Sequence, residues 1–595
     1  MTGPGARPDW RRGRIASLWR RHRARWTLPL VIVVIIGAVA IVDHLGSPRI
    51  SQVDRQSNAA LVAAKGGATT VQIDQPWAGF NPGTPAGAAS STPTLLSSVL
   101  PSAYVVNEKL IPEVNSDLLL SVEATSTSPL TIQYVISPKA VWSDGVPVTA
   151  DDFIYAWLSQ RGNGVDVNGQ PDQVASTLGY RDVKSVVPSK HGKTVTVTFA
   201  QPYTDWRVMF DHMVPAHIAR KVGWNHGFDT FNPAVDLSAG PYILRSVSPT
   251  GSATLVKNKR WWGIPAVLGK VTVHVATGPT SGNSAFSLDE HAVAQSNNFD
   301  LSALNRVSSL PDVDSMLKPS LDLLQLEFNM SSPILVRAGR EAIAHAIDRT
   351  ALLADTFGSI DPDLVVNQDH LATAAQTTYT ASSAAGAYIQ PDLATTDRLL
   401  RSIGYHVSAA GSYVDANGKP LTLRMAVETG DPWISAVANQ ISAQLRATGI
   451  TVITSPVAGQ AGMVAADAAD SYDMALVTRV AGPYLTATAA WYSDGQGPAG
   501  SSGTQDWSKF DDPEVDQLFS QASAALDPVT GGTIYSQIDD QLWDQMVALP
   551  LFGEPGLLAN GVQVDGEAYN PSPDGILWNI SLWTLLKAAP PTSRS

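Results

Sequence analysis

The stretch LQLEFNMSSPILVRAGREAIAHAIDR, residues 324–349, places a strand, a bend and a helix in the middle of the chain. Apolar and polar residues alternate from Leu324 to Asn329, which is the period of a half-buried strand. After a loop, apolar residues recur at helical spacing and predict one amphipathic helix that includes Ile343, Ala346, Ile347 and Ala351. Such a helix needs a partner to cover its apolar face, so the stretch predicts the start of a second lobe.

This stretch resembles a known family. Its pattern FN…R.A…AIDR is similar to that of the extracellular solute-binding proteins of family 5, the oligopeptide- and dipeptide-binding components of ABC importers, in which it marks the crossing from the first lobe to the second. The resemblance implies an α/β fold of two lobes, like a type II periplasmic binding protein of the peptide-binding cluster, with an extra domain inserted in the first lobe.

The composition narrows the class of protein. A length of 595 residues predicts two to four domains, and 44% hydrophobic with 16% charged residues is ordinary for a folded chain. The chain has no cysteine, which excludes disulfides, thiolate nucleophiles, cysteine-ligated metals and a lipid-anchor cysteine. The absence of thiols suits an oxidising compartment outside the cytoplasm.

The N-terminal residues differ in charge from the body. Residues 1–26 hold eight Arg and one Asp, about +7, so the net charge of -13 leaves about -20 for the rest (-13 minus 7). The run TLPLVIVVIIGAVAIV, residues 27–42, is apolar and close to the lower limit for a membrane span. Because the basic side favours the cytoplasm, we expect a single-pass helix with the body outside the cell membrane. The alternative is a leader that is cleaved after Ala40, in a small-x-small pattern.

The first lobe is expected to begin near residue 65. Gly66-Gly67, a strand over residues 70–73 and the loop QPWAGFNP, residues 75–82, resemble the opening of the mature domain in family 5. In this loop Trp77, Phe80 and Asn81 are candidate ligand-binding residues, since aromatic side chains in a polar loop can form the floor of a cleft. The alternative is that the two aromatic residues cover the end of a sheet.

The segment PKAVWSDGVPVTADDFIYAWLSQ, residues 138–160, carries the most specific local match. Thr149 is expected to cap a helix, with Asp152 at the third position as in a capping box. The segment resembles the family block W/F-SDG-x-P-x-T-A-x-D, in which Asp144 is expected to be a turn residue rather than a ligand contact.

Histidines further along do not form a zinc motif. Strands over residues 184–187 and 194–199 precede a helix expected around residues 206–213. His212 and His217 are five residues apart with a proline between them, so they do not share a helical face as an HExxH pair does. We expect no metal and no cofactor. GPY at residues 240–242 and NKRWW at residues 258–262 resemble a hairpin of the family.

The second lobe should contain a β-α-β unit, with strands over residues 421–427 and 450–453 around a helix, and a further strand over residues 472–477. Peptide-binding members carry an Asp after this last strand that pairs with the α-ammonium group of the ligand. The matching residue here is Gly482, while Arg479 nearby favours an anionic or polyhydroxyl group. Arg479 could equally be paired with an acid of the protein. This variant resembles an actinobacterial branch of the family that is linked to cell-wall glycolipid assembly. Tyr484 and Trp491 complete the candidate ligand-binding residues.

The expected domains are described by residue range. They are the basic tail 1–26, the membrane helix 27–45, the linker 46–64, the opening segment of lobe I at 65–82, the inserted domain 83–239, the continuation of lobe I at 240–322, lobe II at 323–553, the return to lobe I at 554–587 and the tail 588–595.

Motifs of catalysis are missing from the sequence. It contains no G-x-S-x-G elbow, no Walker phosphate loop and no HExxH, so we expect a binding protein rather than an enzyme. The acidic body gives no reason to expect nucleic acid as a partner. We expect a monomer that captures a peptide or another polar solute for ABC permease subunits. The alternative is an anchored envelope protein that acts in cell-wall glycolipid assembly through a partner or a glycolipid ligand.

Overall fold

The computed structural model describes residues 61–588 except residue 65 and residues 249–250, 277–287, 432 and 493–504. The predicted cytoplasmic tail, membrane helix and most of the linker lie outside the described residues. Among the residues that are described, none belongs to a helix long and apolar enough to cross a membrane. The described residues belong to one compact unit.

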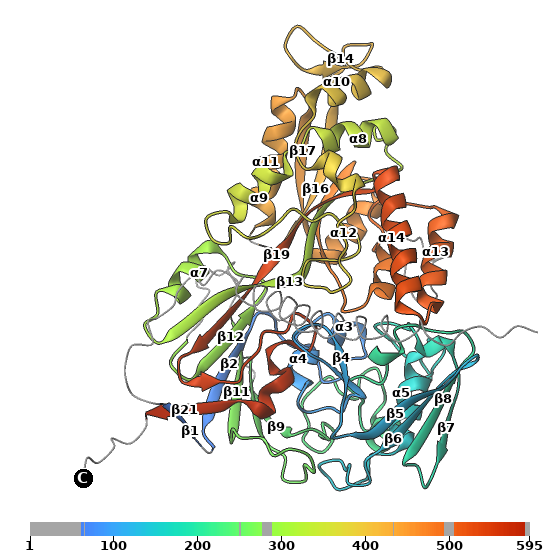
Figure 1. The fold of residues 1–595 in the computed structure, drawn as a ribbon, viewed down its shortest axis with the longest axis vertical. Coiled ribbons are helices and arrows are strands. Elements are labelled where there is room, and N and C mark those ends of the chain that lie inside the picture. The colour runs from blue at the N-terminus through green and yellow to red at the C-terminus, as the bar shows by residue number, and fades with distance from the viewer. Residues whose placement is uncertain are drawn as a thin grey trace, which may run out of the picture. The chain divides into compact units, whose positions relative to one another are not determined.

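A ten-stranded sheet runs through this unit (Figure 1). Its strands in spatial order are β17 (Thr451–Ala458), β16 (Thr422–Thr429), β18 (Met474–Val480), β13 (Val313–Phe328), β19 (Ala548–Gly561), β12 (Ala292–Ser296), β2 (Ala68–Ile73), β11 (Lys270–Val275), β10 (Ser252–Lys257) and β9 (Tyr242–Ser248). The predicted β-α-β unit is confirmed, since β16 and β17 pair in parallel on either side of a helix in the chain.

The long antiparallel strands β13 and β19 connect two hydrophobic cores. One core lies around β2, β9–β11 and the C-terminal segment, and the other lies around the N-terminal half of β19 and the C-terminal half of β13. We call the regions built on these cores lobe I and lobe II. The pairing of β13 with β19 is interrupted between Pro319 and Leu323, so the ladder is weakest where the chain passes from one core to the other.

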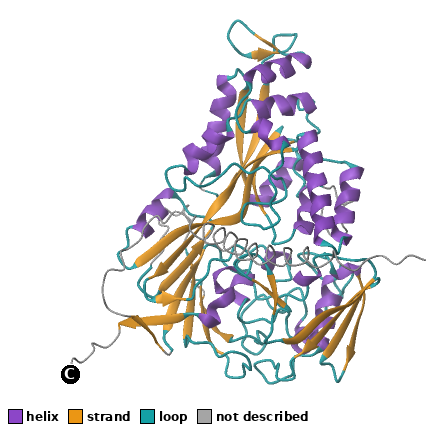
Figure 2. Ribbon diagram, viewed as in Figure 1, coloured by secondary structure: helices purple, strands orange, loops and turns teal. Residues whose placement is uncertain are grey.

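Lobe I adds smaller layers to its portion of the sheet (Figure 2). Its further strands are β5 (Leu119–Thr127), β6 (Leu130–Ile136), β7 (Val183–Ser189) and β8 (Thr194–Phe199) in one antiparallel sheet, β3 (Tyr104–Val106) with β4 (Pro112–Val114), and β1 (Leu61–Ala64), β21 (Thr584–Ala588) and β20 (Val564–Asp565). Its helices are α3 (Pro85–Ala88), α4 (Thr92–Leu96), α5 (Ala150–Gln160), α6 (Ala216–Val222) and α7 (Leu301–Ser308).

Helices make up much of lobe II. They are α8 (Arg337–His345), α9 (Arg349–Phe357), α10 (Leu393–Ser402), α11 (Ile434–Ala447), α12 (Gly459–Ala468), α13 (Pro513–Ala524) and α14 (Pro528–Gln545), and a small hairpin pairs β14 (His406–Val407) with β15 (Tyr413–Val414). Asp512 caps α13 by accepting from the Glu514 N–H, and Pro513 occupies its first turn.

The capping box predicted for α5 is confirmed. The Thr149 side chain accepts from the backbone of the first turn, and Asp152 accepts from the Thr149 backbone N–H at 2.9 Å. The other Asp152 oxygen accepts from the Ala216 N–H at 3.0 Å, at the start of α6. One carboxylate therefore positions the ends of two helices.

Three local predictions are wrong. The helix expected through residues 343–351 is two helices, because Asp348 leaves the helical conformation and caps α9 by accepting from the Ala351 N–H. The helix expected at residues 206–213 is only a 3-10 turn over Trp206–Val208, because Met209 is extended, and the left-handed angles of Phe210 and His212, φ 57° and 42°, keep the chain from resuming a helix. The polar face of the strand at residues 324–329 does not meet water, because its side chains are enclosed by the core of lobe II.

Candidate functional site

A cavity of about 330 Å³ lies between the two lobes. The segment 482–487 of lobe II forms one wall. Lobe I forms the other through Gln160 and through residues within the ranges 82–106, 175–180, 203–212 and 572–574. A second cavity of about 990 Å³ adjoins it and extends along helix α14. Arg207, Pro483 and Tyr484 line both cavities, so the two spaces meet at these residues.

The lobes also contact each other directly beside the cavity. Thr486 Oγ1 donates to Asp205 Oδ2 at 2.7 Å and lies 3.2 Å from the Tyr203 hydroxyl. The Thr204 N–H donates to the Ser523 carbonyl at 2.7 Å. Burial raises the pKa of Asp205, while the hydrogen bonds from Thr486 oppose this shift. These bonds hold the mouth of the cavity together in the conformation described.

Tyr484 lines both cavities. Its hydroxyl is buried and has no hydrogen-bond partner among the described residues. Burial raises the pKa of this phenol, so the hydroxyl stays protonated at neutral pH. A buried hydroxyl without a partner is costly, and a solute that accepts from it would gain a hydrogen bond.

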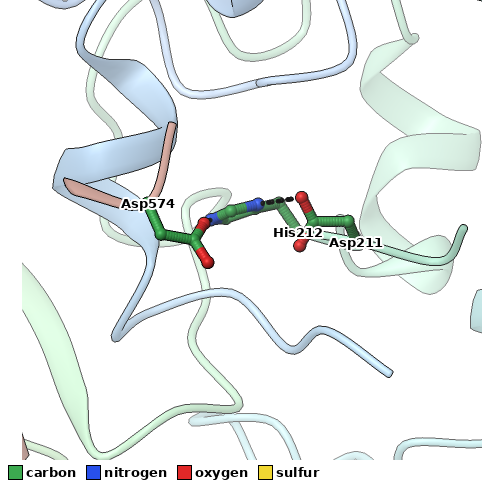
Figure 3. A group of neighbouring side chains, drawn as sticks. All are labelled: Asp211, His212 and Asp574. Carbon is green, nitrogen blue, oxygen red and sulfur yellow. Dashed lines mark ion pairs between the residues drawn. The ribbon is translucent and has the colours of Figure 1, made fainter. Parts of the chain in front are cut away.

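Two carboxylates and one imidazole lie together in the wall of lobe I (Figure 3). His212 Nδ1 lies 2.8 Å from Asp211 Oδ2, and His212 Nε2 lies 3.4 Å from Asp574 Oδ1. The imidazole is almost completely buried, with 4% of its side chain exposed, whereas half of the Asp211 side chain is exposed. Ser102 fixes the group further, because its hydroxyl donates to Asp211 Oδ1 at 2.6 Å and accepts from the His212 N–H at 2.9 Å.

The charged groups of this cluster shift one another's pKa values. Burial lowers the pKa of His212, but the Asp211 and Asp574 carboxylates outweigh it and raise that pKa to about 9. Burial raises the pKa of Asp574 to about 7, although the charge of His212 opposes the shift. Burial would also raise the pKa of Asp211, yet the imidazolium and its hydrogen bonds hold this pKa below its usual value. The group of Asp211, His212 and Asp574 therefore carries a net charge of about -1 or zero, according to the protonation of Asp574.

Among the predicted ligand-binding residues, Gly482 and Tyr484 line the cavity. A Cβ atom built on Gly482 would meet no atom closer than 3.6 Å, so the backbone accepts a side-chain branch at this position. The Gly482 carbonyl accepts from Gln376 Nε2 at 3.0 Å.

Arg479 and Trp491 lie in the interior of lobe II. The Arg479 guanidinium donates to both carboxylate oxygens of Glu327, at 2.6 and 2.7 Å. It also lies 5.8 Å from the ring centroids of Trp491 and Trp507. Arg479 is 4% exposed and Glu327 is fully buried, so this charge is neutralised by an acid of the protein itself.

Trp77, Phe80 and Asn81 pack within lobe I. Phe80 belongs to the core and makes an edge contact with Phe231 at 5.8 Å, and Trp77 packs against the same core. Asn81 is buried and donates to the Trp224 carbonyl at 2.9 Å. The adjoining Pro82 and Gly83, rather than these three residues, line the cavity.

Sequence patterns do not identify Asp211 and Asp574 as members of the site. Asp574 is 362 residues from His212 (574 minus 212), and no local spacing links the two positions. In the sequence His212 stands out only beside His217, which pairs instead with Asp144 at 2.8 Å.

Comparison with known proteins agrees with this architecture. Residues 113–501 match the model of the bacterial extracellular solute-binding proteins, family 5 Middle. An oligopeptide-binding protein, OppA of Mycobacterium tuberculosis, is 27% identical over 482 residues, which cover 78% of this chain and 76% of OppA. A probable monoacyl phosphatidylinositol tetramannoside-binding protein, LpqW of Mycobacterium tuberculosis, is 28% identical over 413 residues, 64% of this chain and 62% of that protein.

A solved structure shares the fold closely. The periplasmic EDTA-binding protein EppA superposes with a TM-score of 0.79 at 25% identity, covering 90% of this chain and 99% of EppA. The match of the family model to more than half of the residues, together with the two-lobed fold, shows that the chain belongs to the bacterial extracellular solute-binding proteins of family 5.

Proposed function

We propose that this protein captures a peptide or a related polar solute between its lobes outside the cytoplasm and presents it to an ABC permease. The observation that carries the proposal is the cavity whose walls come from both lobes, with Tyr484 in the wall that lobe II forms. The oligopeptide-binding relative covers most of the chain and supports the same class of solute. Members of this family are binding proteins rather than enzymes, and no step of catalysis is needed.

Capture would use a hinge between the lobes. The strands β13 and β19 are the links that carry the chain across, near Asp322 and Gly553, and their ladder is interrupted there. Bending at this position would open the cavity and break the Thr486–Asp205 contact. Closure would then be favoured by a solute that touches both walls at once.

The proposal includes the location of the protein. The basic residues 1–26 and the apolar run 27–42 support a single N-terminal membrane helix that leaves the two lobes outside the cytoplasm. The family is extracellular by description, which agrees with this orientation.

A melting experiment tests the proposal. The protein is heated with a mixture of short oligopeptides, and a rise of a few degrees in Tm is expected because a ligand that binds the folded state stabilises it. Thr486→Val serves as a comparison, since valine keeps the shape of the side chain and removes its hydrogen bond to Asp205 of lobe I. No shift with any peptide, at concentrations that saturate a micromolar site, contradicts the proposal.

A second candidate function is an envelope protein of the same fold that acts on cell-wall glycolipids. Gly482 favours it, because a glycine offers no carboxylate to a peptide ammonium group, and LpqW supports it through its described binding of a mannosylated lipid. A rise of Tm with a phosphatidylinositol mannoside and none with peptides would favour this candidate over the first.

A further inference from the structure

We propose that Asp322 and Glu554 form a pH-sensitive switch between the lobes, which holds the described conformation while the acids share protons and favours opening when the protons are lost. The inference rests on the hinge of the proposed function and adds a means of regulation to it. Its basis is the position of the two acids on the strands that connect the lobes.

The two acids lie in the interruption of the β13–β19 ladder. On β13 the ladder stops at Pro319 and resumes at Leu323, so Asp322 lies in the gap. Glu554 lies in the corresponding gap of β19, between the partners of those two residues. Both strands run from one lobe into the other (Figure 1). Bending of this connection therefore changes the surroundings of both carboxyl groups.

Each lobe adds a further acid to the pair. Lobe I supplies Asp74, which follows β2 and acts on Asp322 through its charge. Lobe II supplies Asp431, which follows β16 and lies within hydrogen-bonding reach of Glu554. Two carboxyl groups can hydrogen-bond to each other only if one of them holds a proton. We call Asp74, Asp322, Asp431 and Glu554 the hinge acids, and their contact across the hinge needs a proton.

Neutral hydrogen-bond partners from both lobes hold the hinge acids together. Thr478 Oγ1 of β18 donates to Glu554 Oε1 at 3.3 Å. The Asn297 N–H, after β12, donates to Asp74 Oδ2 at 2.6 Å, and the Asn297 side chain hydrogen-bonds to Asp322. Separation of the lobes would therefore pull the hinge acids apart and admit water between them.

No cation pairs with the hinge acids in the described part of the chain. None of them forms an ion pair with a lysine, arginine or histidine, and the charges acting on those of the two strands come from other hinge acids. The other titratable groups that face them are Tyr569 of lobe I and Glu428 of β16. Arg479 also acts on Glu428, but Glu327 neutralises this guanidinium. Loss of protons thus leaves like charges together.

The pKa values of the hinge acids give the direction of the effect. Burial raises the pKa of Asp74 to about 6, and burial with the charge of Asp431 raises the pKa of Asp322 to about 7. The same two causes raise the pKa of Glu554. In an open conformation water would return these values toward about 4. The conformation that binds more protons gains as the pH falls, so the described conformation is favoured at acidic pH and loses this advantage as the pH rises through about 7.

The distance between the lobes measures the switch directly. Because the chain has no cysteine, spin labels attach only at introduced ones, and Lys184→Cys in lobe I with Val529→Cys in lobe II places them at exposed positions. The full chain in detergent, without solute, is measured by double electron–electron resonance at pH 5.5 and pH 8. We expect the ratio of open to closed molecules to rise by about tenfold or more at the higher pH.

Two sets of variants show whether the hinge acids cause the response. Asp322→Asn combined with Glu554→Gln keeps the shape of both side chains without a titrating proton, so the lobe separation should be equal at the two pH values. Asp236→Asn is the matched control. Burial raises the pKa of Asp236 to about 7 as well, but this acid accepts from the Asn232 N–H within lobe I. This control should keep the wild-type response. Melting curves show which variants fold, and either single substitution should reduce the response if the double variant does not fold.

Two results would overturn the inference. One is a wild-type lobe separation that is the same at pH 5.5 and pH 8, and the other is a pH response that persists without the two acids or disappears in Asp236→Asn. Adding peptides to the labelled protein separates this failure from that of the proposed function. A response to peptide but not to pH would contradict only the switch, and a response to pH but to no peptide would contradict only the proposed class of solute. A separation that neither changes would contradict the hinge itself.

Discussion

Arg479 and Glu327 carry opposite charges in the interior of lobe II, where each needs the other. Both oxygens of Glu327 accept from the guanidinium, and Tyr492 and Gln325 continue the polar network with a hydrogen bond of 3.2 Å. This network explains why polar residues alternate along β13 although the strand has no face in water. The charge that resembled an anion-binding group is a structural charge in this conformation.

Removing one partner of the Arg479–Glu327 pair should strongly destabilise the folded protein. We expect Arg479→Met to lower the free energy of unfolding by about 3–5 kcal/mol, because Glu327 is then left buried without a counter-charge. Denaturant unfolding of both proteins measures the difference.

An exposed ion pair provides the control for this change. Arg337 contacts Glu341 of α8 and Asp544 of α14, each at 2.8 Å, and half of its side chain is exposed. Arg337→Met should cost less than about 1 kcal/mol, as surface pairs do. Equal losses in the two variants would show that the buried pair has no special role.

Gly482 allows the solute preference to be changed at one residue. Its backbone leaves room for a side chain, since the nearest atom to a built Cβ is 3.6 Å away. Gly482→Asp should strengthen binding of peptides with a free amino terminus by roughly tenfold, about 1.4 kcal/mol, through a charge-assisted hydrogen bond.

Calorimetry with a peptide and its N-acetylated form tests this prediction. The acetylated peptide lacks the ammonium group, so its affinity should not rise. Gly482→Asn is the matched control, because it has nearly the same shape without the charge. An equal gain with Asn, or with the acetylated peptide, would contradict the charge argument.

At the scale of elements, the start of α5 shows how one side chain connects two helices. Asp152 accepts from the Thr149 and Ala216 N–H groups, whereas its neighbour Asp151 is exposed. Asp152→Ala should lower the free energy of unfolding by about 2 kcal/mol, because the buried Ala216 N–H and the partly buried Thr149 N–H lose their acceptor. Asp151→Ala should change it by less than about 0.5 kcal/mol. Thermal or denaturant unfolding measures both losses. Equal losses in the two variants would contradict the role of Asp152 in connecting the helices.

At the scale of the molecule, buried acids lie where the lobes connect. Burial and the charge of Asp431 raise the pKa of Asp322 to about 7, and burial likewise raises the pKa of Glu554 on the second strand. The Ser320 hydroxyl donates to the Glu554 carbonyl at 2.7 Å and connects the two strands at this position. Both carboxyl groups therefore hold a proton to higher pH in the folded protein than in the unfolded chain.

This arrangement predicts a pH dependence of stability. A folded-state pKa raised above the unfolded value means that the contribution to stability is complete below about pH 4 and is lost as the pH rises through about 7. Asp322→Asn imitates the neutral acid, so its stability should match the wild type at pH 5 and exceed it at pH 8. Unfolding free energies at the two pH values measure this.

An exposed acid of the same strand region serves as the comparison. Asp312 precedes β13 and its side chain is exposed, so Asp312→Asn should leave the slope of stability against pH unchanged. The prediction fails if Asp322→Asn has the same slope as the wild type.

Local chemistry accounts for the features that could be predicted from residues alone. The cap at Thr149, the proline start of α13 and the β-α-β unit depend on neighbours within a few positions, so their patterns are visible in sequence. The break at Asp348 is also local, but a continuous apolar stripe concealed it.

Contacts between distant residues account for the rest. His212 meets Asp574, and Arg479 meets Glu327, only because strands and loops far apart in the chain are packed side by side. Whether a charge is exposed to a solute or neutralised by the protein depends on that packing, since burial sets the cost of leaving it unpaired. The order of residues thus specified the family and its elements, and the folded arrangement alone determined which side chains form the wall of the cavity.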